Sequence, residues 1–250
     1  MVYLRDQAEI DAIREAARIV GRTLKMLGQH VRPGITTAEL DRLAEDYIRS
    51  QGAEPAFKGY RGFPATICPS VNEQVVHAIP GSTVLKAGDI ISIDVGARKQ
   101  GYYGDAATTF PVGAIDDEAK RLLDVTREAL AAGIAQARPG NRVGDIGHAV
   151  QQHAERNGFS VVRTLVGHGI GREMHEEPQV PNYGPPSRGP RLLAGQVIAI
   201  EPMVNVGGAE VVTGSDGWTV VTRDGSRSAH FEHTVAIGPD GPEILSRVED

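Results

Sequence analysis

The sequence predicts an α+β fold, in which an antiparallel sheet with pseudo-twofold symmetry carries helices on its outer face. Helical patterns come in pairs and apolar strands come in hairpins, an arrangement typical of α+β proteins. An Arg-Pro-Gly motif at 32–34 also returns at 138–140. Because a repeat this long does not fit a solenoid, we expect residues 1–250 to form one domain of two related halves, about 1–112 and 113–250.

An amphipathic helix is expected before each copy of the Arg-Pro-Gly motif. In the first half, apolar residues between Ile10 and Leu27 recur at steps of three and four, which places them on one helical face. Asp6 and Glu9 are spaced as a capping pair at its start. The second half has a matching helical pattern over 116–137.

A second helix is expected after each copy of the motif. The two helical patterns stop at Gly52 and Gly158, as helices that end in a left-handed residue do. The repeat then continues in the apolar segments 85–94 and 192–201, each of which ends in a carboxylate. The clearest strand patterns cover 90–98, 102–111, 160–166, 196–206, 218–223 and 230–237.

Composition excludes several classes of protein. The 250 residues are 40% hydrophobic and 23% charged, which is ordinary globular usage rather than that of disordered or collagen-like chains. A single cysteine excludes a disulfide framework, and a net charge of −6 gives no overall attraction to nucleic acid. Neither a signal-peptide pattern nor an apolar run of about 20 residues occurs. We therefore expect a soluble, cytoplasmic protein without a membrane segment or a direct nucleic-acid site.

Two acids occupy an apolar hairpin in the first half. If residues 98–101 form its turn, Asp94 lies directly opposite Asp105, at the short distance typical of cross-strand partners. Acids on a hairpin are usually solvated at the surface. Here the neighbouring residues are Ile, Val, Ala and aromatic, which favours burial, and a buried pair of carboxylates requires a cation, a shared proton or a metal ion.

The second half supplies further ligands. Glu201 occupies the position that repeats Asp94, and Glu232 lies in another apolar segment. His168 stands between two glycines; alone it is more often a loop residue than a ligand, but beside four buried acids it completes a ligand set. Such a set without sulfur suits two divalent ions such as Mn, Fe, Co or Zn. Because paired ions activate water, the sequence predicts a hydrolase.

The same residues lie in motifs that resemble those of the methionine aminopeptidases, enzymes of the pita-bread fold in peptidase family M24. The matching stretches are 68–73, 89–95, 104–105, 167–172, 175–178, 200–203, 216–219 and 232–234. The resemblance implies a dinuclear metal centre held by Asp94, Asp105, His168, Glu201 and Glu232. The short spacing between the last two residues resembles the type 1 branch, because it leaves no room for the helical insertion of type 2.

The resemblance also implies a reaction. Enzymes of this family remove the initiator methionine from nascent polypeptides whose second residue is small, using a hydroxide that bridges the two metal ions. Here Glu201 would relay a proton toward the leaving nitrogen, His175 would polarise the scissile carbonyl, and His77 would hydrogen-bond near the scissile amide. By itself, a histidine in an apolar strand, as His77 is expected to be, is usually a core residue.

An apolar slot for the methionine side chain follows from the same resemblance. Its expected walls are Phe57, Tyr60, Phe63, Cys68, Met174 and Trp218. Phe63 stands where tyrosine is frequent, Met174 where phenylalanine is frequent and Phe57 where a smaller residue often occurs, so we expect a changed pocket volume with methionine preference retained. Cys68 has no evident base and orienting group beside it, which favours a wall over a nucleophile. The alternative for the aromatic residues is an ordinary core position.

Two other functions remain open on sequence grounds. Proline-specific aminopeptidases and prolidases share the five-ligand pattern but usually carry an extra N-terminal domain, and only a short segment precedes Asp94. Non-catalytic relatives that serve as interaction modules have lost metal ligands, whereas this chain retains all five. The expected partner is the N-terminal methionine of nascent peptides; ribosome association is compatible with it, although no basic cluster indicates it. We expect a monomer, because no long unmatched insertion occurs.

Overall fold

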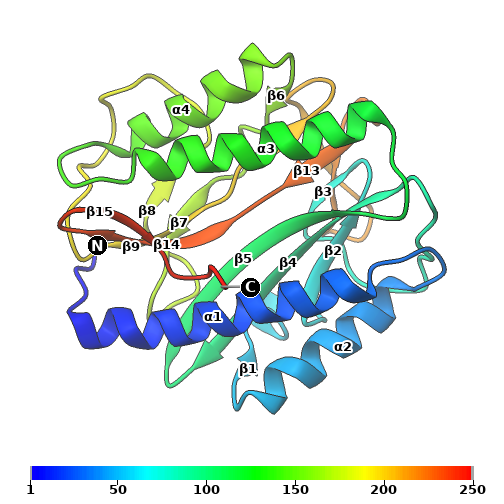
Figure 1. Ribbon diagram of the computed structural model, residues 1–250, viewed down its shortest axis with the longest axis horizontal. Helices are drawn as coiled ribbons and strands as arrows, with labels where there is room; N and C mark the ends of the chain where they lie inside the picture. Colours follow the sequence, from blue (N-terminus) through cyan, green and yellow to red (C-terminus); the bar gives the residue numbers. More distant parts are fainter. Residues whose placement is uncertain (1, 249–250) are drawn as a thin grey trace.

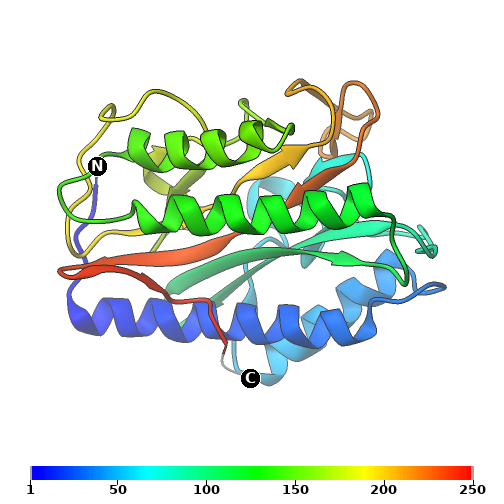
Figure 2. The same cartoon turned by 45° about the horizontal axis from the view of Figure 1, so that its top comes forward.

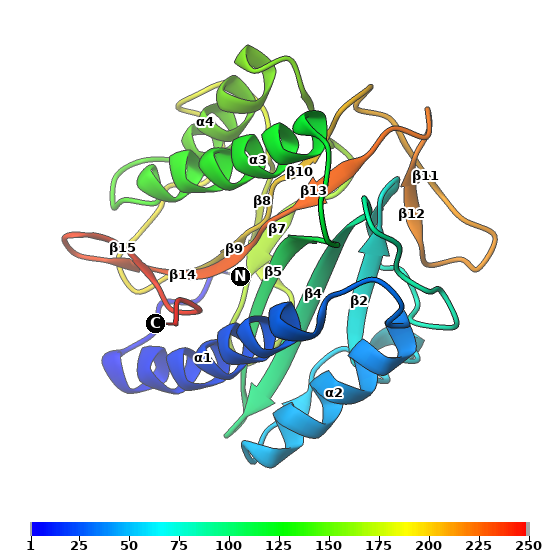
Figure 3. The ribbon, with the colours of Figure 1, turned by 45° about the vertical axis from the view of Figure 1, so that its right-hand side comes forward.

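The computed structural model describes residues 2–248, in which two pairs of long helices flank the strands (Figure 1). The pairs are α1 (Gln7–His30) with α2 (Thr37–Ser50), and α3 (Asp117–Ala135) with α4 (Val143–Arg156). The first pair packs on strands of the first half and the second pair on strands of the second half (Figures 2 and 3). The α+β prediction is confirmed, while the relatedness of the two halves stays a prediction.

The strands pair in antiparallel sheets. One sheet contains β1 (Glu54–Pro55), β2 (Ile67–Val71), β4 (Ile90–Lys99) and β5 (Tyr102–Pro111). A second, in the order β15-β14-β9-β7-β8, contains β7 (Gly167–Gly169), β8 (Glu176–Val180), β9 (Val197–Ile200), β14 (His233–Gly238) and β15 (Gly241–Ile244). Two smaller sheets contain β3 (Gln74–Val76) with β11 (Val211–Thr213) and β12 (Val220–Thr222), and β6 (Ser160–Val161) with β10 (Met203–Asn205) and β13 (Ser228–His230).

The helices begin and end as the sequence predicts. The Asp6 side chain accepts a hydrogen bond from Glu9 N at 2.9 Å and the Glu9 carboxylate accepts one from Asp6 N, which confirms the predicted capping pair. Gly52 and Gly158 follow α2 and α4 with φ angles of 65° and 80°, left-handed values that glycine adopts without strain. The buried faces of α1 and α2 share one apolar cluster with β4, and those of α3 and α4 share another with β9 and β14.

Helix α1 rests very closely on the β4–β5 hairpin. Gly104 lies on β5 at a point where a Cβ atom would be 2.4 Å from the backbone nitrogen of Ala17 in α1. Only glycine lets the two backbones approach this far. This contact fixes the hairpin, and the acids that it carries, against the helix.

The turn of this hairpin is shorter than predicted. Lys99 pairs with Tyr102, so the turn consists of Gln100 and Gly101 rather than of residues 98–101. Their φ angles are 51° and 83°, and two consecutive left-handed residues are what a two-residue hairpin turn requires. The predicted register is therefore wrong by two residues.

Several predicted strands are also shorter than expected. The strand predicted over 196–206 stops at Ile200 and resumes at Met203, because Pro202 between them has no N–H to donate to a ladder. The strand before His77 ends at Val76, and His77 itself has a left-handed φ of 60°, so its placement in a strand is wrong. The strands predicted over 160–166, 218–223 and 230–237 contain β structure at Ser160–Val161, Val220–Thr222 and His233–Gly238, and a separate strand ends at His230. Within residues 2–248, no helix is long and apolar enough to span a membrane.

Candidate metal centre and substrate pocket

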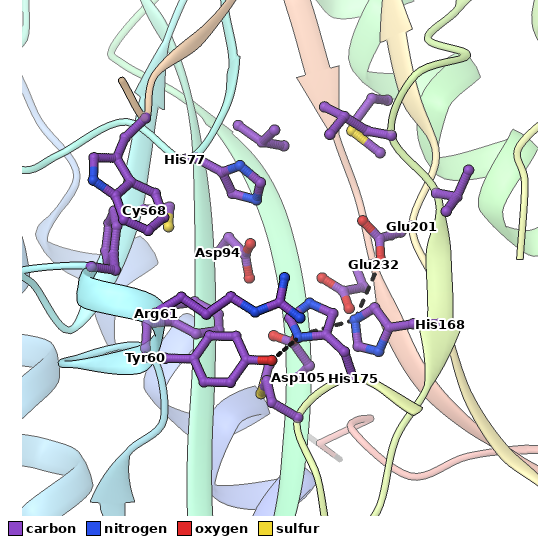
Figure 4. A pocket seen from close by; sticks show the side chains of 18 of the residues that line it. Tyr60, Arg61, Cys68, His77, Asp94, Asp105, His168, His175, Glu201 and Glu232 are labelled. Atoms are coloured by element: carbon purple, nitrogen blue, oxygen red, sulfur yellow. Dashed lines mark hydrogen bonds and ion pairs between the residues drawn. The ribbon is translucent and has the colours of Figure 1, made fainter. Parts of the chain in front are cut away.

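One cavity of about 290 Å³ gathers all the residues that the sequence analysis proposed for a site (Figure 4). Its lining includes the expected metal ligands Asp94, Asp105, His168, Glu201 and Glu232, the histidines His77 and His175, and the expected walls Phe57, Tyr60, Phe63, Cys68, Met174 and Trp218. Residues from distant parts of the chain therefore meet in one place.

Asp94 and Asp105 reach the cavity from the neighbouring strands β4 and β5. They are not the direct cross-strand partners that the sequence predicted, because Asp94 pairs with Ala107 and Asp105 pairs with Gly96. The register shift is two residues and side chains alternate with a period of two, so both acids still project from the same face. They are diagonal neighbours on adjacent strands.

Three further donors come from the second half. His168 lies on β7, Glu201 directly follows β9, and Glu232 lies between β13 and β14. The Nε2 atom of His168 is 3.6 Å from Glu201 Oε1 and 3.8 Å from Asp105 Oδ2. Ligand atoms of Asp105, His168 and Glu232 lie within 4.8 Å of one another. These three side chains are close enough to bind a single metal ion.

The orientation of His168 leaves a lone pair directed at the acids. Its Nδ1 atom lies 2.9 Å from the carbonyl oxygen of Gly169, which only accepts, so Nδ1 carries the hydrogen and Nε2 carries the lone pair. Burial lowers the pKa of His168 to about 4, which keeps the ring neutral. A lone pair facing carboxylates is repulsive without a cation between them, and a ring nitrogen fixed through its other N–H is typical of metal ligands.

The hydrogen bonds of the acids do not offset the cost of burying them. Within the described residues, Asp94 Oδ1, Asp105 Oδ1 and Glu232 Oε1 are buried without a hydrogen-bond partner. Burial raises the pKa of Asp94 to about 7. Burial first, and neighbouring acids second, hold the pKa values of Asp105, Glu201 and Glu232 well above their usual range. Divalent cations supply the missing compensation, so the donor set fits a metal centre.

Hydrogen bonds between the two halves fix the positions of these acids. Asp105 N donates to Thr234 Oγ1 at 3.0 Å, and Thr234 Oγ1 donates to the Asp105 carbonyl at 2.7 Å. The Glu232 N–H donates to the Ala107 carbonyl at 2.9 Å. Strand β5 of the first half is thus tied to β14 through the Thr234 hydroxyl and to the residue before β14 through Glu232 N.

His175 faces the cavity from the segment before β8. Its Nδ1 atom is 2.9 Å from the hydroxyl of Tyr60, and its ring lies 4.2 Å from that of His168, centroid to centroid. Burial, followed by the charges of nearby groups, lowers the pKa of His175 to about 3. The next residue, Glu176, accepts a hydrogen bond from Arg5 at 2.5 Å, and this buried ion pair anchors the segment.

The opposite part of the cavity is apolar. Phe63 and Trp218 meet edge to face with their ring centroids 5.2 Å apart, and Met174 and Phe57 belong to the same apolar cluster. Cys68 is buried among them, and burial raises the pKa of its thiol well above the usual range. A buried protonated thiol is a poor nucleophile, which agrees with an expected wall position.

Some residues at the cavity were not singled out from the sequence. Arg61, Val76, the segment 164–166 and Met203 also line it. His230 is buried with its Nε2 atom 3.9 Å from Glu232 Oε2, and neither ring nitrogen has a hydrogen-bond partner among the described residues. For Arg61 and His230, the sequence contained a feature that could have indicated a place near the site. Arg61 stands in a glycine-rich turn, and His230 precedes an expected ligand by two residues.

Comparison with known proteins decides the family. A model of metallopeptidase family M24 matches residues 11–239. The chain belongs to metallopeptidase family M24. Methionine aminopeptidase 1 of Bacillus subtilis is 56% identical over 99% of this chain and 100% of its own length. Methionine aminopeptidase 1 of Mycobacterium tuberculosis is 47% identical over 98% of this chain and 95% of its own length.

Solved structures agree with this chain in fold. The methionine aminopeptidase from Thermotoga maritima has a TM-score of 0.98 and 46% identity, covering 99% of this chain and 100% of that chain. The prolidase from Pyrococcus furiosus has a TM-score of 0.81 at 22% identity, and this chain spans 66% of it, a likeness of fold alone. The pita-bread fold is therefore confirmed. The chain is more similar to these methionine aminopeptidases than to this prolidase.

Proposed function

We propose that this chain removes the N-terminal methionine from polypeptides whose second residue is small. The main support is one observation: four buried acids and a neutral histidine meet in a cavity whose other walls are aromatic and apolar. The names of relatives that match over the whole chain support the same activity. The uncompensated carboxylates favour a metal-dependent hydrolase over an interaction module.

The metal-binding part of the proposal concerns five side chains. Asp94, Asp105, His168, Glu201 and Glu232 would hold two divalent ions, such as Co, Mn, Fe or Zn. The support is chemical, because oxygen and imidazole donors without sulfur suit these ions. When bound, such ions lower the pKa of water and polarise the bond under attack.

The chain's own groups carry the proton and stabilise the developing charge. Glu201 would accept a proton as water adds to the scissile carbonyl carbon, and it would return that proton to the leaving nitrogen as the C–N bond breaks. Methionine and the shortened peptide are then the products. Glu201 lies at the junction of the acids and His168, 3.6 Å from the ring, which supports this role.

His175 would donate a hydrogen bond to the scissile carbonyl oxygen. If the Tyr60 hydroxyl donates to His175 Nδ1, as their 2.9 Å separation allows, the ring hydrogen lies on Nε2 and remains available to substrate. The lowered pKa of His175 keeps that ring neutral, so the donor stabilises charge as it forms. His77, across the cavity, would hydrogen-bond to the scissile amide.

Specificity would come from the apolar wall. Phe63, Met174 and Trp218 border a space beside the acids, and an unbranched thioether fits such a space because burial of its apolar surface is favourable and sulfur contacts aromatic rings well. We further propose that one domain of two related halves performs this reaction on nascent chains in the cytoplasm. That setting is supported by the substrate, since initiator methionine is present on newly made polypeptides.

A peptide assay tests the proposed function. Protein purified without chelator is incubated with Met-Ala-Ser, Leu-Ala-Ser and an Xaa-Pro peptide, each with Co, Mn, Fe or Zn, and released amino acid is measured by chromatography. We expect methionine release from the first peptide alone, and loss of release after Glu201→Gln. Glu210→Gln is the matched control, because Glu210 is exposed and outside the cavity.

The alternatives give different results in the same assay. Cleavage of the Xaa-Pro peptide with no methionine release would favour a proline-specific peptidase. Absence of bound divalent metal, together with no activity after metal is added, would favour a non-catalytic interaction module.

A further inference from the structure

Arg61 places a positive charge at the edge of the candidate pocket. It belongs to the short turn of Tyr60–Gly62, lines the cavity and is exposed to solvent. Figure 4 shows its side chain beside Tyr60, on the side of the cavity where His175 lies. The guanidinium carbon is 5.3 Å from the centre of the Tyr60 ring. The charge also contributes to the lowered pKa of His175, which places it near that ring.

The charge of Arg61 is not neutralised by a neighbouring acid. Among residues 2–248, no carboxylate lies within 4.0 Å of its guanidinium. Other cations near the pocket are paired: Lys58 contacts Glu45 at 2.7 Å, and Arg5 contacts Glu176 at 2.5 Å. The guanidinium of Arg61 thus remains available to a ligand.

The turn holds Arg61 in a defined position. Its backbone has φ of 50° and ψ of 22°, a left-handed conformation that costs energy for a residue with a Cβ. Gly59 N donates to the Phe63 carbonyl at 2.8 Å and Phe63 N donates to the Tyr60 carbonyl at 2.9 Å. These bonds close the turn, so Arg61 projects from a fixed base.

We propose that Arg61 selects peptides by the charge of their third residue, favouring a carboxylate over an ammonium group. The inference rests on the proposed function: the first side chain fills the apolar wall region, the scissile amide lies near His175, and the rest of the peptide leaves past Arg61. A guanidinium binds a carboxylate through two parallel hydrogen bonds and repels an ammonium group. Peptide selectivity would thus depend on the charge at Arg61 as well as on the apolar wall.

The test compares three peptides that differ only in the charge of their third residue, which is negative, neutral or positive. Met-Ala-Asp-Ala, Met-Ala-Asn-Ala and Met-Ala-Lys-Ala, all amidated at the C-terminus, are hydrolysed by the metal-loaded full chain. We expect kcat/KM to be about tenfold higher for the Asp peptide than for the Lys peptide. Attraction of the Asp carboxylate and repulsion of the Lys ammonium group both contribute, and each exposed charge contact changes the rate constant by up to about fivefold. The ratio should fall at about 0.5 M salt, where exposed charges are screened.

Two variants connect this preference to Arg61. Arg61→Gln should reduce the Asp-to-Lys ratio to within about twofold, mainly through KM, with a larger loss for the Asp peptide than for the neutral Asn peptide. Arg61→Lys should retain part of the preference. Arg22→Gln is the matched control, since it removes the same charge from the exposed face of α1 and should keep the parent ratio.

Each contrary result has a distinct meaning. A parent ratio near one, or a ratio unchanged by Arg61→Gln, would overturn the inference while leaving methionine removal intact. An equal loss for all three peptides would also overturn it, because Arg61 would then act through the turn rather than by reading charge. Failure of the parent to cleave any peptide would overturn the proposed function and this inference with it.

Discussion

The buried acids make a quantitative prediction about metal-free protein. The pKa of Asp94 is raised from 3.8 to about 7 by burial, and each pKa unit corresponds to about 1.4 kcal/mol. Ionising Asp94 in the folded chain therefore costs about 4 kcal/mol relative to the unfolded chain. Between about pH 4 and pH 7 the folded state retains a proton that the unfolded state has released, so the stability of metal-free protein should fall as pH rises through this range.

Asp94→Asn removes this cost while preserving the size of the side chain. At pH 8 the variant avoids about 4 kcal/mol of ionisation, but it buries an amide whose incomplete hydrogen bonding costs about 1–3 kcal/mol. The net expectation is a gain of about 1–3 kcal/mol without metal, and about 2–4 °C in Tm for each kcal/mol in a chain of this length. At pH 5 the parent already holds the proton, so the gain should disappear.

Thermal unfolding followed by circular dichroism at pH 5 and pH 8, with chelator, measures this effect. Asp240→Asn is the control, because Asp240 is exposed in the turn between β14 and β15 and should change little at either pH. Added metal should stabilise the parent but not Asp94→Asn, since ligand binding to the folded state raises its stability. If Asp94→Asn were less stable than the parent at pH 8 in chelator, or equally stabilised at both pH values, the reasoning on buried charge would be refuted.

Three further predictions concern other parts of the molecule. His175→Ala should lower kcat/KM for Met-Ala-Ser about a hundredfold through loss of a charge-stabilising donor, and a change within about twofold would contradict its proposed role. Gly104→Ala should lower the free energy of unfolding by at least about 1–3 kcal/mol in urea titrations, because the new methyl group meets the α1 backbone 2.4 Å away; unchanged stability would show that the helix can shift freely. Cys68 should resist iodoacetamide at pH 8 until the chain unfolds, since its thiol is buried with a raised pKa, and rapid labelling of folded protein, measured by mass spectrometry, would argue against its wall position.

The sequence predicted the positions of the acids better than their geometry. Asp94 and Glu201 could be selected because each ends an apolar segment of the repeat. The exact pairing of Asp94 with the neighbouring strand β5 could not be predicted, because it depends on the length of the turn between the strands. In that turn Gln100 takes a left-handed conformation, which is unusual for glutamine. An error of two residues left both acids on the same face, so the site prediction survived an incorrect register.

The rest of the pocket depends on contacts that no local pattern contains. The segment 164–166 and Met203 line the cavity because of where β7 and β10 are placed by the second half, and sequence spacing alone does not reveal this. His77 was expected in a strand, but it leaves β3 with a left-handed φ of 60°, a conformation imposed by its surroundings. Periodicity predicts elements, whereas tertiary packing decides which of their flanking residues reach the cavity.

The location of the acids explains how the fold tolerates them. Asp105 and Glu232 belong to different halves, and the backbone N–H of each donates to the opposite half, to the Thr234 hydroxyl at 3.0 Å and to the Ala107 carbonyl at 2.9 Å. Because these bonds lie among buried strands, separating the acids to relieve their repulsion would break the connection between the halves. The apolar packing beneath α1 and α3 therefore holds like charges at short distance. Protons or cations, rather than movement of the strands, then remain as the means of relieving that repulsion.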